Sequence, residues 1–353
     1  MMPAQTSQIS EPDVVVEAAA PGKVILFGEH AINRGQPALS ASVGLRARCR
    51  VSRQRATDCF FRSGTIQQAG SHESVVALTR EVEKFRTDSD FESIRRLASS
   101  DYFAPAKYIL GSAFGENLPK GLMVEWESEI PPSSGLGSGG AAFTAMITAM
   151  SAFLPEPATL EQRAAWAHLG DVLAHGGIAS ALDTQTSLLG GIIQFEGQGL
   201  AGAVPCAPGL SLVIGHTGIV ASTREVNTRV RLWLDEKPAH RMAYFRAIGA
   251  LSRAAVPLLR TGNWDELGRL LTLNQLVLEK IGVSCTESNQ LIEAALNAGA
   301  LGAKVSGSGG GGIVIALVTG NSKESVAKAM EAAGGTVLVP EIAVPGAAVV
   351  SRG

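Results

Sequence analysis

A loop rich in glycine and serine is the part of this sequence best suited to hold a phosphate group. It follows an apolar stretch at 121–129 that predicts a strand, and it precedes a stretch at 141–153 that predicts a helix. Glycines let a backbone approach a phosphate closely, and the free amides and dipole of a helix N-terminus attract its negative charge. The loop consists of Pro132, Ser133, Ser134, Gly135, Leu136, Gly137, Ser138, Gly139 and Gly140.

Two interpretations of this loop stay open when it is taken alone. It has neither the GxxxxGK[ST] pattern of a P-loop nor a GxGxxG pattern in a dinucleotide-binding setting. A flexible turn without a ligand therefore explains the loop about as well as a phosphate site does.

A second group of reactive side chains lies near the beginning of the chain. Lys23 starts an otherwise apolar strand predicted at 23–27, and Glu29 and His30 come directly after that strand. Strand ends are usual positions for ligand contacts in α/β folds. The alternative is a solvent-facing lysine followed by an ordinary polar strand end.

A third group is the glycine-rich run at 304–312, which includes Ser306 and Gly307. It lies between two short apolar segments at 303–305 and 313–318 that predict strands. The run holds more glycine than a hairpin requires, which suits a backbone that lies against a ligand. A loose hinge is the alternative.

Alternating strands and helices must position these three groups, and this alternation predicts layered α/β structure in both halves of the chain. Strands are predicted at 13–19, 23–27, 38–51, 121–129, 190–195, 210–215, 303–305, 313–318 and 336–339. Helices are predicted at 141–153, 160–175, 224–234, 239–259, 265–281, 287–298 and 323–333, with one or two surface helices around 74–91. Pro21-Gly22 is expected to separate the first two strands, and a domain boundary is expected near residue 205.

The composition fits a cytoplasmic enzyme with two domains and a cleft between them. The chain has 353 residues, of which 46% are hydrophobic and 18% charged, and a net charge of −2. This balance does not favour nucleic acid or an anionic membrane as a partner. The four cysteines have no metal-binding spacing, and neither a signal segment nor a membrane-spanning run is evident.

Taken in order, the three groups resemble the three motifs of the GHMP kinases. The matching segments are Ala-Pro-Gly-Lys ending at Lys23, Gly-Leu-Gly-Ser ending at Ser138, and the run that begins at Lys304. Gly28-Glu29-His30 and Asn274-Gln275 are most similar to mevalonate kinases, and less similar to galactokinases and homoserine kinases. The resemblance implies an α/β (α+β) fold in two domains. An N-terminal half of the ribosomal S5 domain 2 type would span 1–205 and bind ATP, and a ferredoxin-like half would span 206–353.

The resemblance also implies a catalytic pair, Asp183 and Lys23. The segment from Gly177 to Thr184 is similar to the one that carries the central aspartate of the family. It is only weakly polar, so a buried carboxylate there needs a compensating cation, for which Lys23 is the expected partner. Asp183 would orient or deprotonate the acceptor hydroxyl, and Lys23 would lower its pKa and offset charge on the phosphoryl group.

A magnesium site is the next implication, with Mg²⁺ as the cofactor and ATP as co-substrate. Ser138 and Asp171 are the expected ligands. Family members commonly have a second serine where this chain has Gly139, so either Ser138 takes over that contact or water fills the position, because Mg²⁺ readily keeps several waters. A solvated helix carboxylate is the alternative for Asp171.

The remaining implications concern the acceptor substrate. The substrate-binding residues are expected to be Lys23, Glu29, His30, Asp183, Ser306 and Gly307, with Thr223 and Arg224 in a nearby turn. The implied reaction is phosphorylation of the 5-hydroxyl of mevalonate by a homodimeric enzyme of isoprenoid precursor synthesis. The alternatives are phosphorylation of phosphomevalonate, homoserine or a sugar, or a non-catalytic nucleotide-binding regulator.

Overall fold

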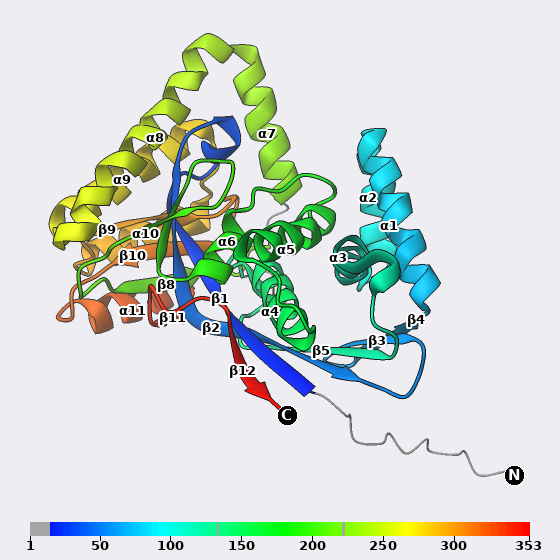
Figure 1. Cartoon of the computed structure of the whole chain (residues 1–353). Helices are drawn as coiled ribbons and strands as arrows, with labels where there is room; N and C mark the ends of the chain where they lie inside the picture. Colours follow the sequence, from blue (N-terminus) through cyan, green and yellow to red (C-terminus); the bar gives the residue numbers. More distant parts are fainter. Residues whose placement is uncertain (1–14, 133, 221–222) are drawn as a thin grey trace, which may run out of the picture.

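The protein consists of two β-sheets with helices packed around them (Figure 1). The structure is a computed structural model that describes residues 15–132, 134–220 and 223–353. Within the described residues the first sheet has the strand order β12-β1-β2-β5-β3-β4, with β6 paired to β2 and β7 paired to β6. Its strands are β1 (Val15–Phe27), β2 (Ala38–Arg53), β3 (Cys59–Ser63), β4 (Ile66–Gly70), β5 (Leu122–Ser128), β6 (Ile192–Phe195), β7 (Gly202–Val204) and β12 (Ala348–Arg352).

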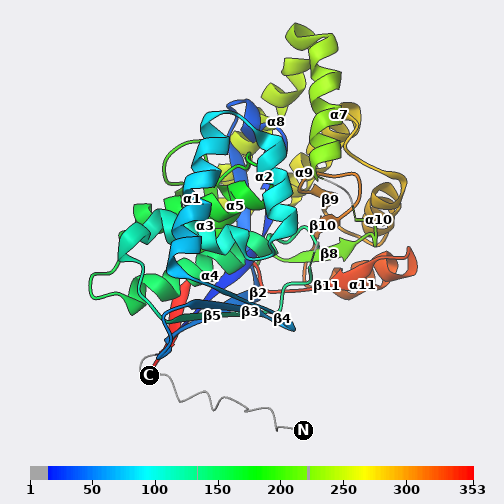
Figure 2. The ribbon, with the colours of Figure 1, turned by 90° about the vertical axis from the view of Figure 1, so that its right-hand side faces the viewer.

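Helices cover one face of this sheet (Figure 2). The apolar positions of β1, β2, β3 and β5 alternate toward α1, α3, α4 and α5 and form one core with them, as expected when every second side chain of a strand points to the same face. The helices are α1 (His72–Thr87), α2 (Phe91–Ser100), α3 (Ala104–Phe114), α4 (Ser138–Phe153), α5 (Leu160–Ala174) and α6 (Leu182–Leu189).

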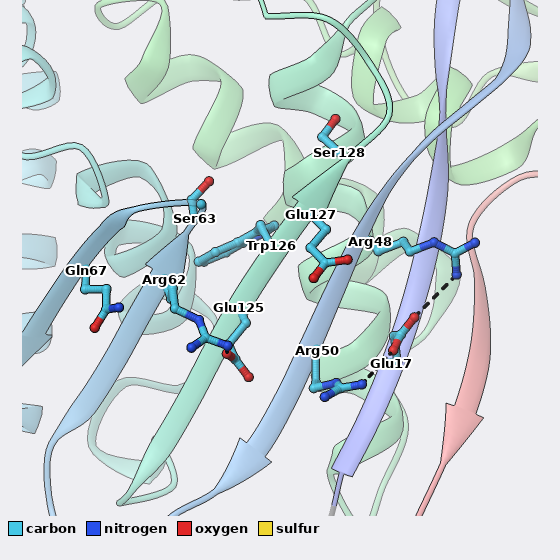
Figure 3. Close-up of a pocket in the computed structure, with 11 residues that line it drawn as sticks. Glu17, Arg48, Arg50, Arg62, Ser63, Gln67, Glu125, Trp126, Glu127 and Ser128 are labelled. Atoms are coloured by element: carbon cyan, nitrogen blue, oxygen red, sulfur yellow. Dashed lines mark hydrogen bonds and ion pairs between the residues drawn. The ribbon is translucent and has the colours of Figure 1, made fainter. Parts of the chain in front are cut away.

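The opposite face of the first sheet carries paired charges (Figure 3). Glu17 lies 3.4 Å from Arg48 and 3.5 Å from Arg50, and Arg62 pairs with Glu125. These residues line a hollow of about 540 Å³. Opposite charges on neighbouring strands stabilise a solvated sheet face by cross-strand attraction. No described residue of the three sequence motifs lines this hollow.

The second sheet is antiparallel, with the order β11-β8-β10-β9 among the described residues. Helices α10 and α11 pack on one face of it. The other face shares an apolar core with the first sheet and with α8 and α9, so the two halves form a continuous interior. Its elements are β8 (Leu212–His216), α7 (Thr223–Glu236), α8 (Pro238–Thr261), α9 (Trp264–Ile281), α10 (Thr286–Asn297), β9 (Gly302–Ser306), β10 (Ile313–Leu317), α11 (Lys323–Ala332) and β11 (Thr336–Leu338).

Several features of the fold were not expected from the sequence. The first two predicted strands form a single strand, β1. Its pairing with β2 shifts between Pro21 and Gly22, which lets the strand continue past a residue that has no N–H to donate. The unanticipated elements are helices α3 and α6 and strands β3, β4, β7 and β12. The last strand, β12, lies beyond the boundary predicted near residue 205 and pairs with β1 of the first sheet.

The described residues include no helix with the length and apolar character required to cross a membrane.

Candidate active site

A cavity of about 450 Å³ brings the three sequence motifs together from both halves of the molecule. It is bordered by β1, the loop before α4, the segment before α6, the start of α7 and the glycine-rich run after β9. Of the residues predicted for the site, the lining includes Lys23, Glu29, His30, Gly135, Gly137, Ser138, Gly139, Gly140, Asp171, Asp183, Ser306 and Gly307. Pro132, Ser134 and Leu136 do not line it, and Ser133 lies outside the described residues.

Lys23 and Asp183 form an ion pair inside this cavity. Lys23 Nζ lies 3.1 Å from Asp183 Oδ2, and the two side chains are 5% and 24% exposed. The same amine donates a hydrogen bond to the carbonyl of Gly135 at 3.3 Å. Asp183 belongs to the first turn of α6, where the positive end of the helix dipole favours a carboxylate. The partner expected for Asp183 is therefore the one the structure contains.

The loop before α4 holds the lysine in place and leaves a helix N-terminus open. The backbone N–H of Lys23 donates to the carbonyl of Leu136 at 2.8 Å, and the Leu136 side chain is fully buried. Gly137 has a left-handed φ of 73°, and α4 begins directly after it with no capping side chain among the described residues. Free amides at a helix start suit an anionic ligand, and Ser138, Gly139 and Gly140 present them along the cavity.

Asp171 and His175 form a second charged pair on the same cavity. Asp171 is buried on α5, and His175 Nδ1 lies 3.4 Å from its Oδ1 and 2.9 Å from its backbone carbonyl. The hydrogen bond to Asp171 raises the pKa of His175 to about 9. Sequence reasoning gave His175 no role, although its spacing of four residues from Asp171 on a helix is a recognisable pairing signal.

Metal binding at this site would depend on few protein ligands. No cluster of three or more His, Cys, Asp or Glu side chains that could hold an ion occurs in the described part of the chain. Ser138 and Asp171 both line the cavity. A hydroxyl and a carboxylate are oxygen donors that Mg²⁺ accepts, and nucleotide phosphates and water commonly complete its shell. The residues present therefore fit a nucleotide-bound magnesium ion.

Glu29 and His30 also line the cavity, and both are buried. Glu29 forms a fully buried ion pair with Lys304, a partner that sequence reasoning missed even though a lysine in an apolar strand signals a buried counter-charge. Burial raises the pKa of Glu29. His30 Nε2 donates to the carbonyl of Ser308 at 2.9 Å, and because a carbonyl only accepts, that nitrogen carries the proton. Burial lowers the pKa of His30 to about 4.

Acid is expected to destabilise the fold through His30. Its pKa of about 4 lies below the ordinary value of 6.5, so the unfolded chain takes up the proton first as pH falls. The loss of stability begins near pH 6.5, ends near pH 4 and is on the order of 3 kcal/mol. Denaturant unfolding at about pH 7.5 and about pH 5 measures it: His30→Gln should lose less stability than wild type. The exposed control His240→Gln should match wild type, and an equal loss in His30→Gln would contradict the assignment.

Ser306 joins the two sheets at this cavity. Its hydroxyl accepts from Ile25 N at 2.8 Å and donates to Ile25 O at 3.0 Å, so its proton is already committed to the protein. Gly307 has a φ of 101° and space on its Cβ side. Thr223 begins α7 and lines the cavity, and its Oγ1 lies 3.2 Å from Ser308 Oγ. Arg224 instead lines a separate surface hollow.

Comparison with known proteins identifies the class to which this fold and site belong. A model described as the GHMP kinases N terminal domain matches residues 102–191, and one described as GHMP kinases C terminal matches residues 255–336. The chain belongs to the GHMP kinase family. The predicted two-domain GHMP kinase fold of mixed α/β structure is thereby confirmed.

Within that family the similarity is to mevalonate kinases, as the motifs indicated. The mevalonate kinase of Thermococcus gammatolerans is 32% identical over 94% of this chain and 97% of its own length. The crystal structure of the Methanococcus jannaschii mevalonate kinase matches with a TM-score of 0.76 at 19% identity, covering 96% of this chain and 99% of that one. The L. major mevalonate kinase, solved in complex with R-mevalonate, matches with a TM-score of 0.70 at 24% identity, covering 94% and 96%.

Proposed function

We propose that this protein transfers the γ-phosphoryl group of ATP to the 5-hydroxyl of mevalonate, as a kinase of isoprenoid precursor synthesis. The observation that carries the proposal is the Lys23–Asp183 pair, which shares one cavity with a helix N-terminus suited to phosphates and with Glu29 and His30. Mevalonate is assigned as the acceptor because this chain is similar over nearly its full length to mevalonate kinases.

The residues divide the chemistry between them. Gly135 to Gly140 would bind the ATP phosphates through backbone amides and the dipole of α4. Asp183 would orient the acceptor hydroxyl and take its proton, while Lys23 lowers the pKa of that hydroxyl and offsets charge on the transferred group. Bound Mg²⁺, held by Ser138 and Asp171 with water, would neutralise phosphate charge. Most of the catalysis would be positioning and electrostatics.

The apolar part of the cavity lining favours a short aliphatic hydroxy acid over a sugar. Ile25, Ile32 and Leu182 line the cavity, and all three are buried. A sugar presents several hydroxyls that would each need a polar partner, and apolar walls leave such groups unsatisfied. Mevalonate instead has a methyl group and three methylenes that could pack against these side chains.

The cations of the cavity do not favour an acceptor that is already phosphorylated. Among the described lining residues, the basic ones are Lys23, His30 and His175. Lys23 pairs with Asp183 and His175 with Asp171, while burial keeps His30 neutral at physiological pH because its pKa is lowered to about 4. A phosphate group on the acceptor would lack a free counter-charge.

The intact Lys23–Asp183 pair argues against a non-catalytic regulator.

The experiment that tests this proposal is ADP release by the purified protein with ATP and Mg²⁺. The acceptors are mevalonate, phosphomevalonate, homoserine, galactose and none. Release that depends on mevalonate is expected. Release that depends on another acceptor would overturn the acceptor assignment, and no release with any of them would favour the regulator. Removing Mg²⁺ with EDTA should abolish the activity, because the positive charge that offsets the phosphate oxygens would be lost.

Several further predictions remain part of this proposal. They are a domain boundary near residue 205, a cytoplasmic location and a homodimeric assembly. ATP and mevalonate would be its small-molecule partners, with neither nucleic acid nor a membrane involved.

A further inference from the structure

The ion pair between Glu29 and Lys304 is the strongest unexplained feature beside the proposed catalytic pair. Both side chains are completely buried, one after β1 of the first sheet and the other on β9 of the second. The Lys304 amine also donates to the carbonyl of Val305 at 2.6 Å. Burying two charges costs more free energy than packing apolar side chains of the same volume, so such a pair is weak support for stability alone.

One oxygen of this pair is left without a donor. Lys304 binds Oε1 of Glu29, whereas Oε2 is buried and has no hydrogen-bond partner among the described residues. Glu29 lines the cavity, and Lys304 does not. A buried carboxylate oxygen without a donor is costly, and a ligand hydroxyl is the kind of group that would supply one.

Side chains on one face of strand β9 hold both the Glu29 carboxylate and strand β1. Lys304 and Ser306 are two residues apart on the strand, so their side chains leave the same face. Ser306 binds both the N–H and the carbonyl of Ile25, and Lys304 binds Glu29. The second sheet therefore fixes two points of the segment that follows Lys23.

We propose that Lys304 is a positioning residue that holds Oε1 of Glu29, so that Oε2 accepts a hydrogen bond from a hydroxyl of the acceptor substrate. The inference rests on the proposed function. With mevalonate as acceptor, the 5-hydroxyl lies at Lys23 and Asp183, and the hydroxyl at Glu29 is the one on carbon 3. Lys304 never touches the substrate and acts only through Glu29.

The test compares mevalonate with 5-hydroxy-3-methylpentanoate, which lacks the 3-hydroxyl but keeps the hydroxyl that is phosphorylated. Wild type should prefer mevalonate in kcat/KM by roughly tenfold or more, the effect of one hydrogen bond to a charged group. Lys304→Met should lose most of that preference through a higher KM for mevalonate, with the KM for ATP within about twofold of wild type. A merely structural defect would move both KM values.

Two further variants make the test decisive. Glu29→Leu/Lys304→Met removes both charges at similar volume, so it should fold and show no preference. Lys107→Met is the matched control, because Lys107 forms another buried ion pair, with Asp101, away from the cavity. It should keep the wild-type preference even if its melting temperature falls.

The outcomes separate this inference from the proposed function. A wild-type preference retained in folded Lys304→Met, or in the double variant, would overturn the role of Lys304. Equal use of both acceptors by wild type would overturn the contact with Glu29 while supporting the kinase assignment. Phosphorylation of neither acceptor would contradict both this inference and the proposed function.

Discussion

Replacing Asp183 by asparagine should lower kcat by about three orders of magnitude, within the range of a lost general base. Asparagine keeps the shape of the side chain but can neither accept the hydroxyl proton nor balance the charge of Lys23, which lies 3.1 Å away. ATP binding should change little, because the phosphates are expected on the loop before α4 and not on α6.

Steady-state kinetics with mevalonate and calorimetric titration with a non-hydrolysable ATP analogue measure the two effects. The control is Asp88→Asn, an exposed aspartate at the end of α1, which should retain wild-type turnover. Turnover within a few fold of wild type in Asp183→Asn would remove Asp183 from the mechanism.

Replacing Gly137 by alanine should reduce kcat by about a hundredfold, the cost typical of displacing a reacting group by about 1 Å. A Cβ at this position would lie 2.8 Å from Cγ and 2.9 Å from Cε of Lys23, closer than packed atoms allow. Gly137 also has a φ of 73°, which alanine adopts only with strain. The side chain of Lys23 or the loop before α4 must therefore shift, and either shift disturbs the Lys23–Asp183 pair.

Gly282→Ala is the matched control for Gly137→Ala. Gly282 ends α9 with a φ of 82°, so alanine meets the same backbone strain, but no atom lies within 4 Å of its Cβ position. It should lose about 1 kcal/mol of stability and keep its turnover. Comparable turnover in the two variants would show that Gly137 does not support the position of Lys23.

Local sequence patterns predicted those parts of the site whose structure depends on residues close together in the chain. The strand at β5, the loop after it and the start of α4 were recognisable because apolar alternation, glycine content and helix composition each act over a few residues. The same logic misjudged Pro21-Gly22, since a shift in pairing with β2 keeps the strand continuous. It also missed α6, an eight-residue helix too short to show a clear period.

Only the tertiary structure decided which charged groups meet. The sequence determined the three motifs, their order, the resemblance to the GHMP kinases and the expectation that Lys23 faces Asp183. The pairing of Glu29 with Lys304, and of Asp171 with His175 at the cavity, depends on how two sheets pack across a shared apolar core. Buried charges must find counter-charges, but residues distant in sequence become neighbours only through that packing, which no local pattern encodes.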